Sequence, residues 1–123
     1  TQTQTEKAAA SLNQQHADYN KTSAQVLRDT QAAHRQLNSA THLWKAYTQA
    51  DRAATQQQLA IETAIKHQLA TPLDLAKAKE KLTELQMKKM EYLRAANKAY
   101  LLVHELTGKL NIEGALERLS KRE

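Results

Sequence analysis

The longest stretch without a helix breaker most limits what this chain can fold into. Between Glu6 and Gln68 there is neither glycine nor proline. Along it, apolar or small residues recur at alternating spacings of four and three, with a few polar interruptions. The series is Leu12, His16, Tyr19, Ser23, Val26, Thr30, Ala33, Leu37, Ala40, Trp44, Tyr47, Asp51, Ala54, Gln58, Ile61 and Ile65. A heptad pattern sustained over this many turns is typical of a coiled coil. The sequence therefore predicts one helix over about residues 6–68.

A second stripe lies one residue earlier on the same predicted helix. It consists of Leu43, Ala46, Ala50, Ala53, Gln57, Ala60 and Ala64. One residue corresponds to about 100° around a helix, so the two stripes are separate faces. Small side chains also let helix backbones approach closely. We therefore expect this helix to contact a neighbour on each side, as in a curved wall of helices, with the alanine stripe buried.

The only proline marks the start of a second helix. Thr71 suits the N-cap, where its hydroxyl accepts a backbone N–H, and Pro72 suits the first helical position. Asp74, three residues after the cap, can reach back to it and lies at the positive end of the helix dipole. These signals predict a tight interhelical turn at about residues 68–71.

The second helix is predicted to run over about residues 72–107. Gly108 is a natural helix stop, and Asn111 can cap a short last helix over about residues 112–120. The predicted fold is all-α: one segment, residues 1–123, forming a long antiparallel helical hairpin. The residues expected to pack in its seam are Leu37, Trp44, Tyr47, Ala50, Ala53, Leu82, Leu85, Tyr92 and Val103.

The predicted helices differ in length. At about 1.5 Å per residue, the second helix covers the first only back to about residue 32. Residues 6–31 then need another chain or further segments to pack on, so we expect self-association. The alternative is a break near Asn38-Ser39 that closes a three-helix bundle, but the heptad pattern continues through this point and favours one helix. The polar Thr-Gln start without Met suggests a fragment of a longer protein.

Charge and hydropathy exclude two classes of partner. The formal net charge is +5, but residues 1–68 carry seven basic and five acidic residues and 69–108 also carry seven and five. Without a clustered basic face, nucleic-acid binding is not expected. The longest apolar run is residues 99–103, far short of the roughly 20 residues of a membrane-spanning helix.

No catalytic or metal-binding arrangement is recognisable in the sequence. The five histidines, His16, His34, His42, His67 and His104, include no pair at the three- or four-residue spacing that converges on a metal. The acidic residues are mostly flanked by Lys or Arg at helical spacing, as in surface ion pairs. The sequence contains no Gly-rich phosphate loop and no nucleophile motif. We therefore predict a protein that is not an enzyme and needs no cofactor.

The order of these features resembles the TolC family of outer-membrane efflux proteins. The stretch from Thr71 to Ala78 is similar to the segment just past the helical-hairpin tip in that family. Tyr92, Ala96, Tyr100 and the Leu106-Thr107-Gly108 ending match its downstream order. The likeness covers roughly residues 9–119. The family's tip glycine aligns with Gln68, which leaves the left-handed turn open, and the family's gating residues have no counterpart at Ile65, Ala70 and Lys77.

The resemblance implies a structural role in export. In that family three copies build a periplasmic α-barrel beneath an outer-membrane β-barrel, and hairpin tips meet the adaptor protein of a multidrug pump or type I secretion system. It implies periplasmic localisation in a Gram-negative cell and the C-terminal of two repeats. The expected adaptor-contact residues are Ile65, His67, Gln68, Leu69, Ala70, Thr71, Pro72 and Leu73. The alternative is an unrelated α-helical coiled-coil scaffold module.

Overall fold

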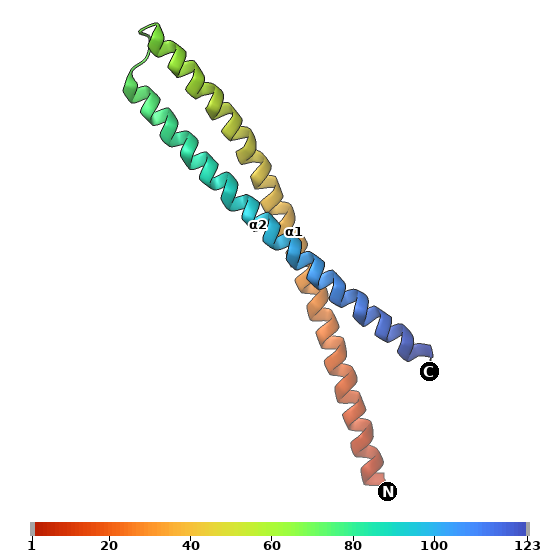
Figure 1. Cartoon of the computed structure of the whole chain (residues 1–123). Coiled ribbons are helices and arrows are strands. Elements are labelled where there is room, and N and C mark those ends of the chain that lie inside the picture. The colour runs from red at the N-terminus through yellow and green to blue at the C-terminus, as the bar shows by residue number, and fades with distance from the viewer. Residues whose placement is uncertain (1, 123) are drawn as a thin grey trace. The chain divides into compact units, whose positions relative to one another are not determined.

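The computed structural model describes residues 2–122, with the side chains of Ser120 and Arg122 outside the described set. Within this range there are two helices, α1 (Gln2–Lys66) and α2 (Pro72–Arg122), and no strand. Figure 1 shows the single short connection between them. The predicted all-α helical hairpin is confirmed. Helix α1 continues through Asn38-Ser39, so the break needed for a three-helix bundle is absent.

The predicted stop at Gly108 and the separate helix over residues 112–120 are wrong. Helix α2 runs without interruption to Arg122, and no described glycine has a positive φ. A glycine inside a helix costs about 1 kcal/mol relative to alanine, which favourable neighbours can offset. Here no proline follows Gly108, and the buried side chains of Val103 and Leu106 hold the preceding turns. The longer α2 therefore covers more of α1 than the sequence suggested.

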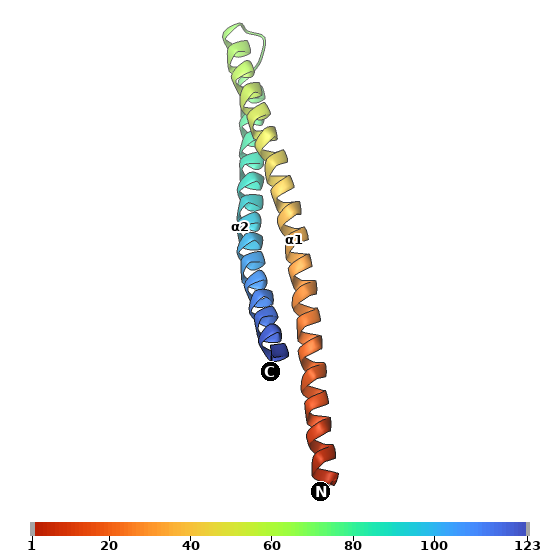
Figure 2. The same cartoon turned by 90° about the vertical axis from the view of Figure 1, so that its right-hand side faces the viewer.

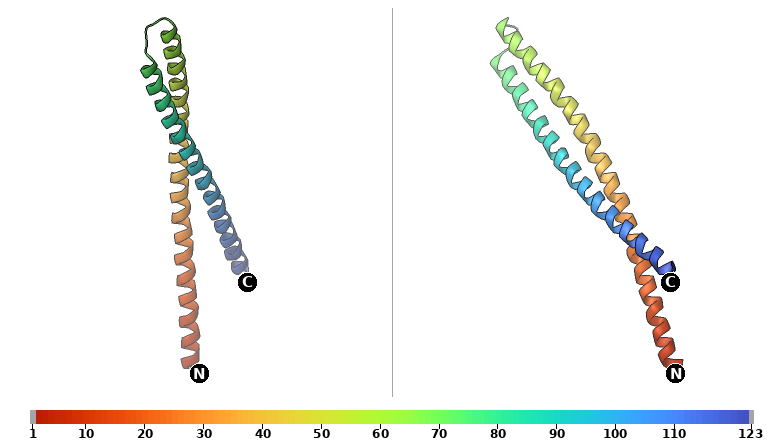
Figure 3. Two further views of the ribbon diagram at one scale, coloured as in Figure 1. Left: turned by 60° about the vertical axis from the view of Figure 1, so that its left-hand side comes forward. Right: turned by 45° about the vertical axis from the view of Figure 1, so that its right-hand side comes forward.

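The chain divides into two compact units. The first, which we call the hairpin unit, consists of residues 35–100 and contains the turn. Within it α1 and α2 lie side by side and antiparallel, as the views in Figures 2 and 3 show. Its most buried apolar side chains are small: Ala40, Ala54 and Ala99. Small side chains therefore fill the most buried positions between α1 and α2 in this unit.

The second unit, which we call the terminal unit, combines residues 1–34 with 101–123. Ala33, Val103 and Leu106 are buried, and buried Thr30 donates its hydroxyl hydrogen to the Val26 carbonyl at 2.7 Å. The Tyr19 hydroxyl lies 3.3 Å from the Glu113 carbonyl oxygen, so α2 reaches back to Tyr19 rather than to residue 32. All side chains over residues 2–18 are exposed.

Candidate functional site: the hairpin tip

Helix α1 ends in a Schellman motif at the tip. The backbone N–H of Leu69 donates to the Ala64 carbonyl at 2.8 Å, and that of Gln68 donates to the Ile65 carbonyl at 3.0 Å. These are the two bonds that satisfy the last carbonyls of a helix when the next residue is left-handed. Gln68 is that residue, with a φ of 62°. The position that the sequence left open therefore adopts the left-handed conformation without being glycine.

Helix α2 begins with a reciprocal capping box. The Thr71 hydroxyl accepts the Asp74 backbone N–H at 3.2 Å, and the Asp74 carboxylate accepts the Thr71 backbone N–H at 2.9 Å. Pro72 occupies the first helical position and has no N–H to satisfy. Local hydrogen bonds therefore satisfy backbone groups at the C-terminus of α1 and at the N-terminus of α2. Residues 67–71 connect the two helices.

The capping box sets the protonation of its carboxylate. The hydrogen bonds from the Thr71 backbone N–H and from its hydroxyl lower the pKa of Asp74 below its ordinary value, and the nearby Lys77 acts in the same direction. A carboxylate that accepts hydrogen bonds is stabilised in its charged form. The folded state therefore favours the ionised form of Asp74.

The apolar side chains of the tip point into solvent. Leu69 is 81% exposed and Leu73 is 62% exposed. Packing of Leu69 back onto Ile65 and Leu73 would explain a leucine in this turn, and the exposure of Leu69 shows that it does not pack this way. The structure gathers the predicted tip residues at one end of the hairpin unit. Ile65 and Ala70 are half-buried there, and His67, Gln68, Thr71 and Pro72 are exposed.

The predicted seam residues lie in different environments. Val103 is buried, and Ala53 is exposed. The others are half-buried: Leu37, Trp44, Tyr47, Ala50, Leu82, Leu85 and Tyr92. The rings of Tyr47 and Tyr92 stack across the two helices, with centroids 5.4 Å apart and planes 11° from parallel. Helix α2 of the same chain does not cover Ala53, so only another chain or segment can bury it.

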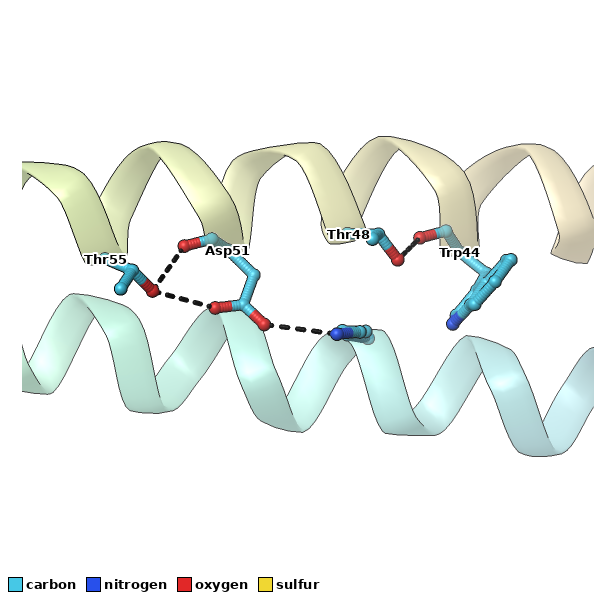
Figure 4. Close-up of polar contacts among 5 residues, drawn as sticks. Trp44, Thr48, Asp51 and Thr55 are labelled. Atoms are coloured by element: carbon cyan, nitrogen blue, oxygen red, sulfur yellow. Dashed lines mark hydrogen bonds and ion pairs between the residues drawn. The ribbon is translucent and has the colours of Figure 1, made fainter.

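An ion pair crosses the seam of the hairpin unit. The Lys89 ammonium donates to the Asp51 carboxylate at 3.3 Å, and the Thr55 hydroxyl also approaches that carboxylate at 3.3 Å. Figure 4 shows Asp51 and Trp44 reaching from α1 toward α2. The Asp51 side chain is only 15% exposed. The heptad stripe of the sequence included Asp51, but the sequence analysis did not pair it with Lys89. Lys89 lies four residues after Leu85 and three before Tyr92, and this heptad spacing was a usable signal.

The described residues present an exposed apolar tip and an open face of α1. Among residues 2–122 no three side chains of His, Cys, Asp or Glu come together as a metal site. No described helix is long and apolar enough to cross a membrane. Comparisons with protein-family models, curated proteins and solved structures find no match to this chain. The function is therefore argued from the tip and from the faces of the hairpin.

Proposed function

We propose that this chain is the helical-hairpin portion of a TolC-like outer-membrane export channel. In this role the helices, with those of other copies, form the wall of a periplasmic α-barrel, and the tip docks against a periplasmic adaptor protein. The parent protein would be a trimer in the outer membrane of a Gram-negative cell. The chain has a structural and docking role and needs no cofactor and no catalytic residue.

The observation that carries this proposal is the exposed leucine on a rigid turn. Leu69 is 81% exposed at a turn whose backbone is held by the Schellman motif and the capping box. A large apolar side chain there adds nothing to the turn, whereas Gly, Asn or Asp would serve the backbone equally well. A leucine on a preorganised backbone loses little conformational entropy on binding, which favours a contact at this point.

Two further observations support the family rather than an arbitrary helical module. Gln68 adopts the left-handed conformation at the position where the family carries its tip glycine. The alanine stripe of α1 is largely uncovered by α2, as expected for a helix with a second neighbour in a wall. The alternative, an unrelated coiled-coil scaffold, also uses long paired helices but does not require an apolar tip.

The experiment is a pull-down of the full-length parent with its cognate adaptor. We expect Leu69→Asp to abolish capture, because it places a charge in a small end-on contact that gains strength only by repetition around a ring. The matched control is Leu59→Asp, which changes another exposed leucine, 57% exposed, away from the tip. Equal capture of wild type and Leu69→Asp, with unchanged helical circular dichroism, would remove the tip from the interface.

The gene of the full-length parent distinguishes the export channel from the scaffold module without a binding experiment. A signal peptide and about four long amphipathic strands encoded upstream of this segment would support the channel. A parent made only of coiled-coil sequence would favour the scaffold module.

A further inference from the structure

One face of α1 in the hairpin unit is largely uncovered and carries no charge. We call it the alanine flank: Leu43, Ala46, Ala50, Ala53, Gln57, Ala60 and Ala64. Every member is exposed or half-buried. A quarter of the whole sequence is charged, yet none of these seven positions is. A helix face that is open and uncharged over this length is suited to packing against another helix.

On the same side of the hairpin unit, α2 presents a row of charges. Gln57 of the alanine flank lines one shallow groove together with Lys77 and Lys81, and Tyr47 lines another with Glu84 and Lys88. At the corresponding heptad positions along α2 lie seven charged residues, all exposed, which we call the charged flank. They are Asp74, Lys77, Lys81, Glu84, Lys88, Glu91 and Lys98.

In the charged flank, residues at equal distances before and after Gln86 carry opposite charges. Glu84 and Lys88 lie two residues on either side of Gln86, and Lys81 and Glu91 lie five on either side. Asp74 and Lys98 lie twelve residues on either side. Each of these three pairs is of opposite charge. Lys77 is the exception, because its counterpart is the neutral Ala95.

Such a pattern is complementary to itself only when the second helix is antiparallel. An antiparallel copy centred on Gln86 places Lys81 opposite the partner's Glu91 and Glu84 opposite the partner's Lys88, and each pair occurs twice. If the copies were parallel with α2 packed on α2, each charged residue would face the same residue of the partner, which has the same charge. Charges that flank a helix interface determine orientation and partner choice more than they determine affinity.

Along the hairpin unit, the centre of the alanine flank lies level with Gln86, the centre of the charged flank. Asp51 lies opposite Lys89 and Tyr47 opposite Tyr92, so Ala53 and Ala54 of α1 are level with Gln86. A twofold axis there places Ala50 opposite the partner's Gln57 and Leu43 opposite the partner's Ala64, with Ala53 of each copy beside the axis. One twofold rotation therefore pairs α1 with the partner's α1 and α2 with the partner's α2.

We propose that the free chain forms an antiparallel dimer through this side of the hairpin unit. The occupant of the alanine flank is the alanine flank of a second copy, and the charged flanks of the two copies pair beside it. The result is a four-helix arrangement with α1 on α1 and α2 on α2. It also covers a hairpin unit whose described residues include no fully buried large side chain. This inference is independent of the channel proposal, in which the copies are parallel.

The orientation is tested by disulfide trapping, because the natural chain has no cysteine. Ala50→Cys and Gln57→Cys are mixed, each on an otherwise unchanged full chain, and oxidised. We expect the mixed disulfide dimer to dominate and each variant alone to cross-link poorly. Arg52→Cys, on the opposite side of α1, is the control and should not cross-link. Strong self-linkage of Ala50→Cys and of Gln57→Cys would show parallel copies and overturn the proposal, while leaving the channel possible.

The charge pattern is tested by reversing charges on the charged flank. Sedimentation equilibrium compares the wild type with a basic variant, Glu84→Lys with Glu91→Lys, and an acidic variant, Lys81→Glu with Lys88→Glu. We expect the dimer dissociation constant of each variant alone to rise at least about tenfold. We expect an equimolar mixture of the two to recover dimerisation, while circular dichroism shows every sample helical. A monomeric wild type, or a mixture no tighter than its components, would overturn the proposal.

Discussion

Thr71 and Asp74 show how two side chains define the start of a helix. Each accepts a backbone N–H of the other, so two donors that the helix leaves open are satisfied together. The sequence allowed this pair to be predicted because its elements are local, three residues apart, and need no distant partner.

The first prediction concerns the cap hydroxyl. Replacement of Thr71 by Ala should lower the free energy of unfolding by about 1 kcal/mol, because the Asp74 N–H loses its acceptor. The measurement is chemical denaturation followed by circular dichroism. Thr63→Ala is the control, since the Thr63 hydroxyl bonds only to the Leu59 carbonyl within the same helix. Equal effects of the two changes would mean that the cap contributes nothing specific.

The second prediction is the pH dependence of the Asp74 contribution. Because the hydrogen bonds from Thr71 lower the folded-state pKa of Asp74 below its ordinary value of 3.8, the folded state favours the ionised form. The stabilisation is therefore complete above the ordinary pKa and is lost as the pH falls below it through the lowered pKa. Melting temperatures of wild type and Asp74→Ala should differ at pH 7 and converge toward pH 2. A difference that persists undiminished at pH 2 would contradict this assignment.

At the scale of the helices, α2 is longer than its sequence suggests. Gly108 carries the strongest stop signal after the turn, yet it lies inside the helix. A Cβ added to Gly108 would meet nothing within 4 Å. The glycine is therefore neither a cap nor a close-packing site in the single chain.

The third prediction follows from this environment. Gly108→Ala should raise the free energy of unfolding by about 1 kcal/mol, because alanine favours the helix and has room for its methyl group. Thermal melting of the two chains measures the effect. A destabilised variant would indicate that position 108 needs a left-handed backbone, as a helix stop does.

The fourth prediction concerns the ion pair in the seam. Lys89→Met should cost about 1–2 kcal/mol, between the values for exposed and fully buried pairs, since it leaves the Asp51 carboxylate without its cation. Adding Asp51→Leu to the same chain should recover part of that loss. Lys109→Met is the control, because Lys109 pairs with Glu105 at an exposed position outside the charged flank. Equal effects of the two lysine changes would contradict a special role for the seam pair.

The sequence predicted the elements that depend on local signals and missed those that depend on contacts. The heptad pattern and the capping residues were sufficient for the two antiparallel helices. The continuation past Gly108 required Val103 and Leu106 to be buried, which a local stop signal does not report. At the tip, the sequence placed Leu69 on the turn but could not decide whether it packs back, because that depends on where the ends of α1 and α2 lie.

At the scale of the whole molecule, the alanine flank is the feature that the single chain leaves unexplained. Two adjacent residues of α1 face its two possible neighbours. Ala54 faces α2 of the same chain, and Ala53 faces the side proposed to bind a second copy. Ala54 is 8% exposed within the chain, whereas Ala53 is exposed. Their contrast separates packing inside one copy from packing between copies.

The fifth prediction uses that contrast. Ala54→Leu should destabilise the chain by about 1–3 kcal/mol at every concentration, because the larger side chain overpacks the in-chain seam. Ala53→Leu should have an effect only at protein concentrations where copies associate. Melting at a low and a high micromolar concentration distinguishes the two. Loss of stability in Ala53→Leu at high dilution would mean that this face is already packed within one chain.

The bonds that close the turn come from the backbone and from Thr71 and Asp74. The side chains of Leu69 and Leu73 take no part in them, and both are largely exposed. The bonds that shape the turn and the apolar surface that it exposes therefore belong to different residues within one short segment. Under the proposed docking role, substitutions at these two leucines would change what the tip binds, during evolution or in a designed hairpin, without any compensating change in the helices that carry it.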